Sequence, residues 1–132
     1  MSKFERFEDI ESWKKARELN KKIYELTNAE GFNRDFGFKD QIRRASLSIS
    51  SNIAEGFERG GDKEFYQFLS VAKGSCGEVR SQLYLAYDIK YISREEAETL
   101  LEEASEISKM INGLMKYLRS SDFTGKKYKW LS

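Results

Sequence analysis

The sequence contains no histidine, no proline and a single cysteine, and each shortage excludes a class of structure or chemistry. Without histidine the commonest general base and metal ligand is missing, and one cysteine cannot form an intrachain disulfide or a thiolate zinc site. A di-iron carboxylate bundle is excluded too, because it needs a Glu-x-x-His motif on each of two helices. We therefore expect no enzymatic activity, no metal and no other cofactor.

Long apolar runs are also missing. No segment approaches the ~18 apolar residues that suggest a membrane span, and the opening, Met1 to Glu11, has no apolar region for export. Together with the lone cysteine, this predicts a soluble protein of the reducing cytoplasm. The net charge is +1, from 23 basic and 22 acidic residues, so bulk charge argues neither for nor against a nucleic-acid partner.

Helix-forming residues are abundant, and apolar residues recur at spacings of four and three. The clearest stripe comprises Phe65, Leu69, Ala72, Cys76, Val79, Leu83 and Ala86, and the next Leu100, Ala104, Ile107, Ile111, Leu114 and Leu118. Such spacing is typical of one buried face of a helix. With weaker patterns earlier in the chain, it predicts helices at about 9–28, 38–58, 62–91 and 93–119, followed by a basic, aromatic tail at 120–132. We assign no chemistry to Cys76, because a buried thiol behaves as a small hydrophobe.

The connections between these segments are short, so consecutive helices should run antiparallel. Ser93 and Glu96 have the spacing of a capping box, which predicts a turn of about two residues before the last helix. Phe32 and Phe36, in a loop flanked by glycines, are expected to cover one end of the core. At 132 residues the chain is the size of one domain. We predict an all-α fold, a single domain over residues 1–132, arranged as an antiparallel up-and-down four-helix bundle with a left-handed twist.

A row of polar side chains follows the apolar face of the second helix at the same spacing. Its members are Gln41, Arg44, Ser48, Asn52, Glu55 and Arg59, and small residues of the third helix, Gly74, Ser75 and Gly77, are expected to pack against the same helix. Glu78 is the expected partner of Arg44 or Asn52. Polar groups beside a core specify helix register or oligomer state, which is the simpler interpretation. A ligand site or a nucleic-acid site remains the alternative.

The nucleic-acid alternative depends on two basic groups. The first is Lys39, Arg43 and Arg44 on the second helix, and the second is the tail, where Lys126, Lys127 and Lys129 alternate with aromatic residues. Interleaved basic and aromatic side chains can contact phosphates and stack on bases. Asp40 stands four residues before Arg44, however, so part of this charge is expected to be neutralised within the helix.

One run of the second helix resembles a known family. Gln41 to Ala45, Ser48-Ile49 and the string Asn-Ile-Ala-Glu-Gly at 52–56 are similar to the signature of four-helix bundle proteins encoded within bacterial 23S rRNA intervening sequences, and the likeness extends over about 7–118. The chain also resembles the accessory protein of diversity-generating retroelements, a pentameric bundle thought to bind nucleic acid. The resemblance implies a bundle that forms homopentamers and has no established enzymatic activity. The near-neutral charge departs from a strongly basic nucleic-acid-binding surface.

Overall fold

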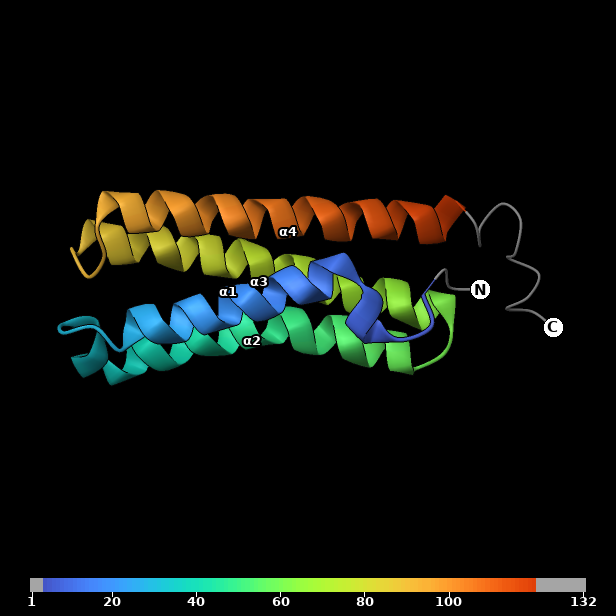
Figure 1. Cartoon of the computed structure of the whole chain (residues 1–132), viewed down its shortest axis with the longest axis horizontal. Coiled ribbons are helices and arrows are strands. Elements are labelled where there is room, and N and C mark those ends of the chain that lie inside the picture. Colours follow the sequence, from blue (N-terminus) through green and yellow to red (C-terminus); the bar gives the residue numbers. More distant parts are fainter. Residues whose placement is uncertain (1–3, 121–132) are drawn as a thin grey trace.

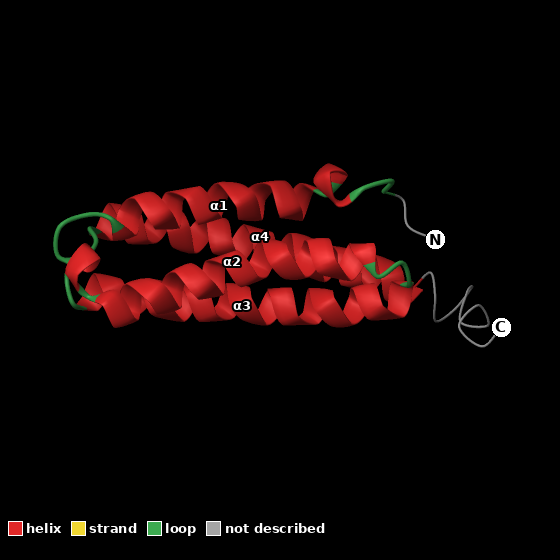
Figure 2. Cartoon of the chain, turned by 90° about the horizontal axis from the view of Figure 1, so that it is seen from below, coloured by secondary structure: helices red, strands yellow, loops and turns green. Residues whose placement is uncertain are grey.

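The computed structural model describes residues 4–120, which form four long helices along one axis (Figure 1). These are α1 (Glu11–Thr27), α2 (Phe36–Glu58), α3 (Asp62–Asp88) and α4 (Arg94–Ser120), with short 3-10 helices at Phe7–Asp9 and Phe32–Arg34. Figure 2 shows that the connections lie at the two ends of the bundle, so each long helix reverses the direction of the one before it. The predicted all-α four-helix bundle is confirmed.

The core is formed by the predicted apolar stripes. Every member of the stripes on α3 and α4 is buried, as are Ile42, Ile49 and Ile53 of α2 and Ile23 of α1. Leu19, which the sequence analysis did not assign to the core, is also fully buried on α1. Burying a Leu or Ile side chain stabilises a fold by about 1.5–3 kcal/mol, so these stripes outweigh the weak helix propensity of the serine-rich middle of α2.

One end of the core is closed by aromatic rings. Phe32 is fully buried, and its ring centroid lies 5.1 Å from that of Phe38 and 5.0 Å from that of Tyr91. The Tyr91 hydroxyl donates a hydrogen bond of 2.9 Å to Asp35, which raises the pKa of Tyr91. Phe36 does not join this cluster, and the prediction that it covers the core is wrong: its side chain is 74% exposed. Asp35 accepts from the backbone N–H of Phe38, so α2 begins at Phe36, whose first-turn position faces outward.

The connection between α3 and α4 combines a confirmed cap with a longer turn than predicted. Ser93 Oγ accepts from the Glu96 N–H at 3.0 Å, and the Glu96 carboxylate accepts from the Ser93 N–H at 2.9 Å, as expected of a capping box. The helix before it ends early, at Asp88, because Lys90 adopts a left-handed φ of 66°. The N–H of Tyr91 then bonds to the carbonyl of Ala86, which is a Schellman motif. The turn therefore spans residues 89–93, and the two-residue prediction was too short.

The helices α2 and α3 approach each other closely at Gly56. A Cβ added at Gly56 of α2 would lie 2.5 Å from the Cβ of Phe68, so this position has room for hydrogen alone. Ser75 is buried at the same contact, as predicted for the small residues of α3. Gly74 and Gly77 are not, since a Cβ at either would have no neighbour within 4 Å. The prediction that these two glycines pack against α2 is therefore wrong.

None of the helices within residues 4–120 combines the length and the apolar character that a membrane span requires.

Candidate functional site

The polar row of α2 lies along the border between α2 and α3. Ser48 and Asn52, at its centre, are half-buried. The hydroxyl of Ser75 donates to Ser48 Oγ at 2.8 Å, and the Asn52 amide donates to Ser48 Oγ at 2.9 Å and to the Ser48 carbonyl at 2.7 Å. This cluster joins the two helices and satisfies most of its own polar groups, so its centre is a structural contact with an exposed edge.

The charged members of the row pair along α2. Arg44 Nε lies 2.8 Å from an Asp40 oxygen, and this hydrogen bond raises the pKa of Arg44. Arg59 lies 3.0 Å from a Glu55 oxygen. Because Arg44 pairs with Asp40 and Asn52 bonds to Ser48, the prediction of Glu78 as their partner is wrong. The two ion pairs, Arg44–Asp40 and Arg59–Glu55, are exposed, so each contributes little to stability.

A second stripe runs along α3 beside this row. Its members are Val71, Ser75, Glu78, Gln82, Leu85 and Ile89, at spacings of four, three, four, three and four. The apolar ones are open to solvent: Val71 is 53%, Leu85 48% and Ile89 43% exposed. The side-chain amide oxygen of Gln82, Oε1, is buried and has no hydrogen-bond partner among residues 4–120. The sequence analysis missed this stripe, although its regular spacing is the signal that could have revealed it.

The two rows together form what we call the α2–α3 outer face. We define it by the polar row of α2, from Gln41 to Arg59, and the α3 stripe from Val71 to Ile89. Because Ser48 contacts Ser75 and Gly56 contacts Phe68 in antiparallel helices, Gln41 lies level with Gln82 and Arg44 with Glu78. The face is thus polar along α2 and partly apolar along α3, and its two halves are held in fixed register.

The α2 residues predicted for nucleic-acid binding, Lys39, Arg43 and Arg44, already have partners within the chain. Arg43 donates from Nε to Thr27 Oγ1 at 2.8 Å, and its guanidinium stacks 4.2 Å from the centre of the Tyr24 ring. Lys39 donates to Asn33 at 2.7 Å, and Arg44 pairs with Asp40. Arg43 therefore fastens α2 to α1. Lys126, Lys127 and Lys129 lie outside the described residues.

A buried polar network between α1 and α2 was not foreseen. The side chain of Asn20 donates to Ser50 Oγ at 2.8 Å and accepts from Ser46 Oγ at 2.6 Å. Ser46 is fully buried and Ser50 nearly so. All three polar groups are thereby satisfied, so the network fixes how α1 and α2 align.

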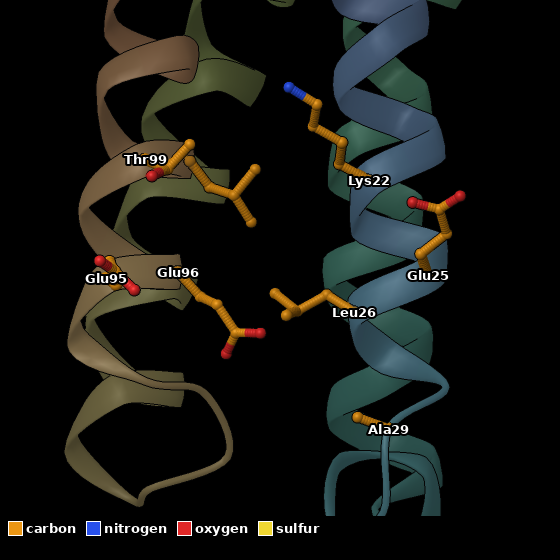
Figure 3. Close-up of a pocket in the computed structure, with 8 residues that line it drawn as sticks. Lys22, Glu25, Leu26, Ala29, Glu95, Glu96 and Thr99 are labelled. Atoms are coloured by element: carbon orange, nitrogen blue, oxygen red, sulfur yellow. The ribbon is translucent and has the colours of Figure 1, made fainter.

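The border between α1 and α4 holds an open cleft. Its volume is about 590 Å³, and it is lined from α1 by Lys22, Glu25, Leu26 and Ala29 and from α4 by Glu95, Glu96, Thr99 and Leu100. Leu26 and Glu96 point toward each other from opposite walls (Figure 3). Beyond the cleft, Lys22 lies 2.6 Å from Glu103 and Lys15 lies 3.8 Å from Glu106, so charged pairs bridge these helices.

Two observations bear on metal binding and on the chemistry of the single thiol. No group of His, Cys, Asp and Glu side chains within residues 4–120 could hold a metal ion. Burial raises the pKa of the Cys76 thiol to about 12, so it carries a thiolate in a negligible fraction of molecules at neutral pH. The buried thiol confirms its assignment to the core.

Comparisons with known proteins agree with this architecture. A crystal structure of a protein of unknown function from the S23 ribosomal protein family of Bacteroides thetaiotaomicron VPI-5482 superimposes with a TM-score of 0.74 and 25% sequence identity. The match covers 80% of this chain and 95% of that one. No curated protein matches the chain. The family model of the 23S rRNA-intervening sequence protein matches residues 8–113, which include all of α1, α2 and α3 and most of α4. The resemblance noted in the sequence is confirmed, and the chain belongs to the 23S rRNA-intervening sequence protein family.

Proposed function

We propose that this protein is a non-enzymatic assembly protein, whose copies associate through the α2–α3 outer face. The observation that carries the proposal is the second stripe of α3. Its exposed Val71 lies level with the hydrogen-bonded Asn52 of α2, and its exposed Leu85 and Ile89 continue the stripe past the end of the α2 row. Apolar residues at spacings of four and three on a solvent-facing side are typical of a second helix-packing seam.

The size of the face suits a small contact between copies. From Val71 to Ile89 the face is about 27 Å long at 1.5 Å per residue, and two adjacent helices are about 20 Å wide. The resulting area of about 540 Å² for each partner falls at the low end of specific protein interfaces. The face combines exposed apolar residues towards the ends of the α3 stripe with charged pairs such as Arg44–Asp40 and Arg59–Glu55, a mixed composition that protein interfaces share.

Gln82 provides further support. Its side-chain oxygen Oε1 has no hydrogen-bond partner among residues 4–120. An unpaired buried acceptor lowers the stability of a fold by about 1–3 kcal/mol. If this half-buried side chain turned toward an adjoining copy, Oε1 could accept a hydrogen bond from a donor of that copy. The chemistry of the described residues supports a non-catalytic role, because neither a metal-binding group nor an ionised thiol is available.

The proposal is tested by the mass of the protein in solution. We expect the full chain to be a homo-oligomer by light scattering, and Leu85→Glu to reduce its mass to that of one chain, because the charge would be buried at the contact. Circular dichroism of Leu85→Glu should keep its helix signal, since Leu85 is 48% exposed in the single chain.

Tyr84→Glu is the matched control. Tyr84 precedes Leu85 on the same helix, is 59% exposed and lies off the second stripe, so this variant should keep the mass of the unchanged protein. A monomeric full chain, or an unchanged mass for Leu85→Glu, would contradict the proposal.

A further inference from the structure

The cleft between α1 and α4 has an apolar floor and an acidic rim. Leu100 is 5% exposed and Leu26 is half-buried, and the methyl-bearing side chains of Ala29 and Thr99 continue the floor. Glu25 and Glu95 stand at the rim. Neither side chain forms a hydrogen bond or a salt bridge with the described residues, and Glu25 interacts with Lys22 only at longer range. Lys22, the one basic residue of the lining, is paired with Glu103. The cleft therefore presents unneutralised negative charge around apolar surface.

The chain itself contains a segment of the complementary composition. Residues 126–131 read Lys-Lys-Tyr-Lys-Trp-Leu, which joins three positive charges to two aromatic rings and a leucine. A cleft lined by Leu26 and Leu100 suits the rings, and carboxylates at its rim suit the lysines. We propose that the segment 126–131 of one copy binds in the α1–α4 cleft of a second copy, an inference that rests on the proposed self-assembly.

Geometry favours a second copy over the same chain. The cleft lies at the start of α4, about 20–24 residues before its end at Ser120, which is about 30–36 Å away at 1.5 Å per residue. The ten residues from Ser121 to Trp130 span at most about 33–36 Å when fully extended. The chain's own segment would have to turn back along α4 to reach the cleft. Its full extended length is needed to cover the distance, so no residues remain to form that turn.

Such a contact joins the C-terminal segment of one copy to the opposite end of the bundle of another, so it is heterologous and repeats from copy to copy. It closes when the copies form a ring. The α1–α4 cleft and the α2–α3 outer face lie on different helices, so one copy can use both at once.

The contact can be tested by disulfide cross-linking of the full chain with Cys76→Ala as background. Ser132→Cys places a thiol beside the segment without altering its lysines or rings, and Thr99→Cys places one in the cleft. Under mild oxidation we expect a ladder of covalent multimers on a non-reducing gel. The paired control is Ser132→Cys with Asp88→Cys, an exposed position off the second stripe at the end of α3. It lies at the same end of the bundle as the cleft but outside it, and should cross-link about tenfold more slowly.

Charge reversal in the cleft provides a second readout. Adding Glu25→Lys and Glu95→Lys to the Thr99→Cys pair should slow its cross-linking about tenfold, because attraction becomes repulsion. Glu5→Lys with Glu58→Lys makes the same change in net charge at the opposite end, and should leave the rate unchanged.

A product that stays the size of one chain would show binding of the chain's own segment and overturn the second-copy proposal. Equal rates at Thr99→Cys and Asp88→Cys would overturn binding in the cleft altogether. Light scattering of the reduced protein separates the two proposals: an oligomer with equal rates contradicts only the cleft contact, whereas a monomer contradicts self-assembly as well.

Discussion

The α2–α3 and α1–α4 contacts join antiparallel helices of one bundle, yet they are built in opposite ways. The first is close, with Gly56 against Phe68 and a hydrogen bond between Ser48 and Ser75. The second leaves a cleft of about 590 Å³ and is bridged by long charged side chains, among them Lys22 and Glu103. Side-chain size along the border decides between the two, because glycine and serine let helix backbones approach and lysine and glutamate hold them apart.

This difference assigns different roles to the two sides. A pair of helices locked by small residues and hydrogen bonds forms a rigid platform, which suits association between preformed surfaces. An open, acidic cleft with an apolar floor suits an extended basic segment instead. The following predictions test the comparison, from the largest expected effect to the smallest.

The core shared by both contacts should tolerate no charge. Val79→Asp buries an uncompensated carboxylate at a position that is fully buried, which should cost about 3–5 kcal/mol. This loss is a large share of the about 5–15 kcal/mol by which a domain is stable, so the melting temperature should fall steeply. Ser81→Asp is the matched control on the same helix, because Ser81 is exposed and lies off the second stripe, so this change should alter the stability by less than about 0.5 kcal/mol. Thermal melts followed by circular dichroism measure both, and an unshifted melt for Val79→Asp would show that the stripe is misassigned.

The stability of the bundle should also depend on the polar network that joins α2 to α1. Asn20→Ala removes the partner of Ser46, which is fully buried, and the stranded hydroxyl should cost about 2 kcal/mol. Urea denaturation measures the loss, with Ser51→Ala, an exposed serine of α2, as the control that should leave the midpoint nearly unchanged. Equal midpoints for the two variants would show that the network contributes nothing.

The close approach of α2 and α3 should appear as opposite responses of two glycines. Gly56→Ala places a methyl group 2.5 Å from Phe68 Cβ, so we expect a net loss of about 1 kcal/mol, after the gain in helix propensity. Gly77→Ala, with no atom within 4 Å, should instead stabilise α3 by about 0.5–1 kcal/mol. Denaturation midpoints that move in the same direction would contradict the difference in packing.

The ion pair across α1 and α4 should have the smallest effect, and it should depend on pH. The hydrogen bond to Glu103 raises the pKa of Lys22 above its ordinary value of 10.5. A raised lysine pKa stabilises the folded state below that ordinary value, and the contribution is lost as the pH rises through the folded pKa. Because Lys22 is 47% exposed, we expect less than about 1 kcal/mol.

Glu103→Gln should therefore lower the free energy of unfolding at neutral pH and converge with the unchanged protein in strong alkali. Glu102→Gln, an exposed neighbour without a partner in the described residues, is the control at each pH. A difference between Glu103→Gln and the unchanged protein that persisted undiminished in strong alkali would exclude the ion pair as its source.

The sequence predicted features that depend on local spacing. The stripe from Phe65 to Ala86 and the capping box of Ser93 and Glu96 involve residues within a few turns of one another, so periodicity and cap chemistry were sufficient. Contacts between distant segments were not predicted. Asn20 lies 26 residues before Ser46, and no local pattern indicates which faces of α1 and α2 meet.

The errors have the same origin. Glu78 was predicted as the partner of Arg44 or Asn52, but both side chains bind residues four positions away on α2 itself, Asp40 and Ser48. Phe36 was placed on the core because it is apolar, whereas the cap formed by Asp35 sets the start of α2 and turns that side chain outward. In the candidate site, the α2 row was predicted, but the α3 stripe beside it was hidden by the stronger core stripe of the same helix.

The most direct test of the account is the distance between copies measured by pulsed electron paramagnetic resonance. With Cys76→Ala as background, one spin label per chain is attached at Ser51→Cys, on α2 beside the outer face, or at Lys21→Cys, on the exposed side of α1. If copies associate through the α2–α3 outer face, the label at position 51 gives the shorter distance between copies. A shorter distance at position 21, or no dipolar coupling at either position, would contradict it.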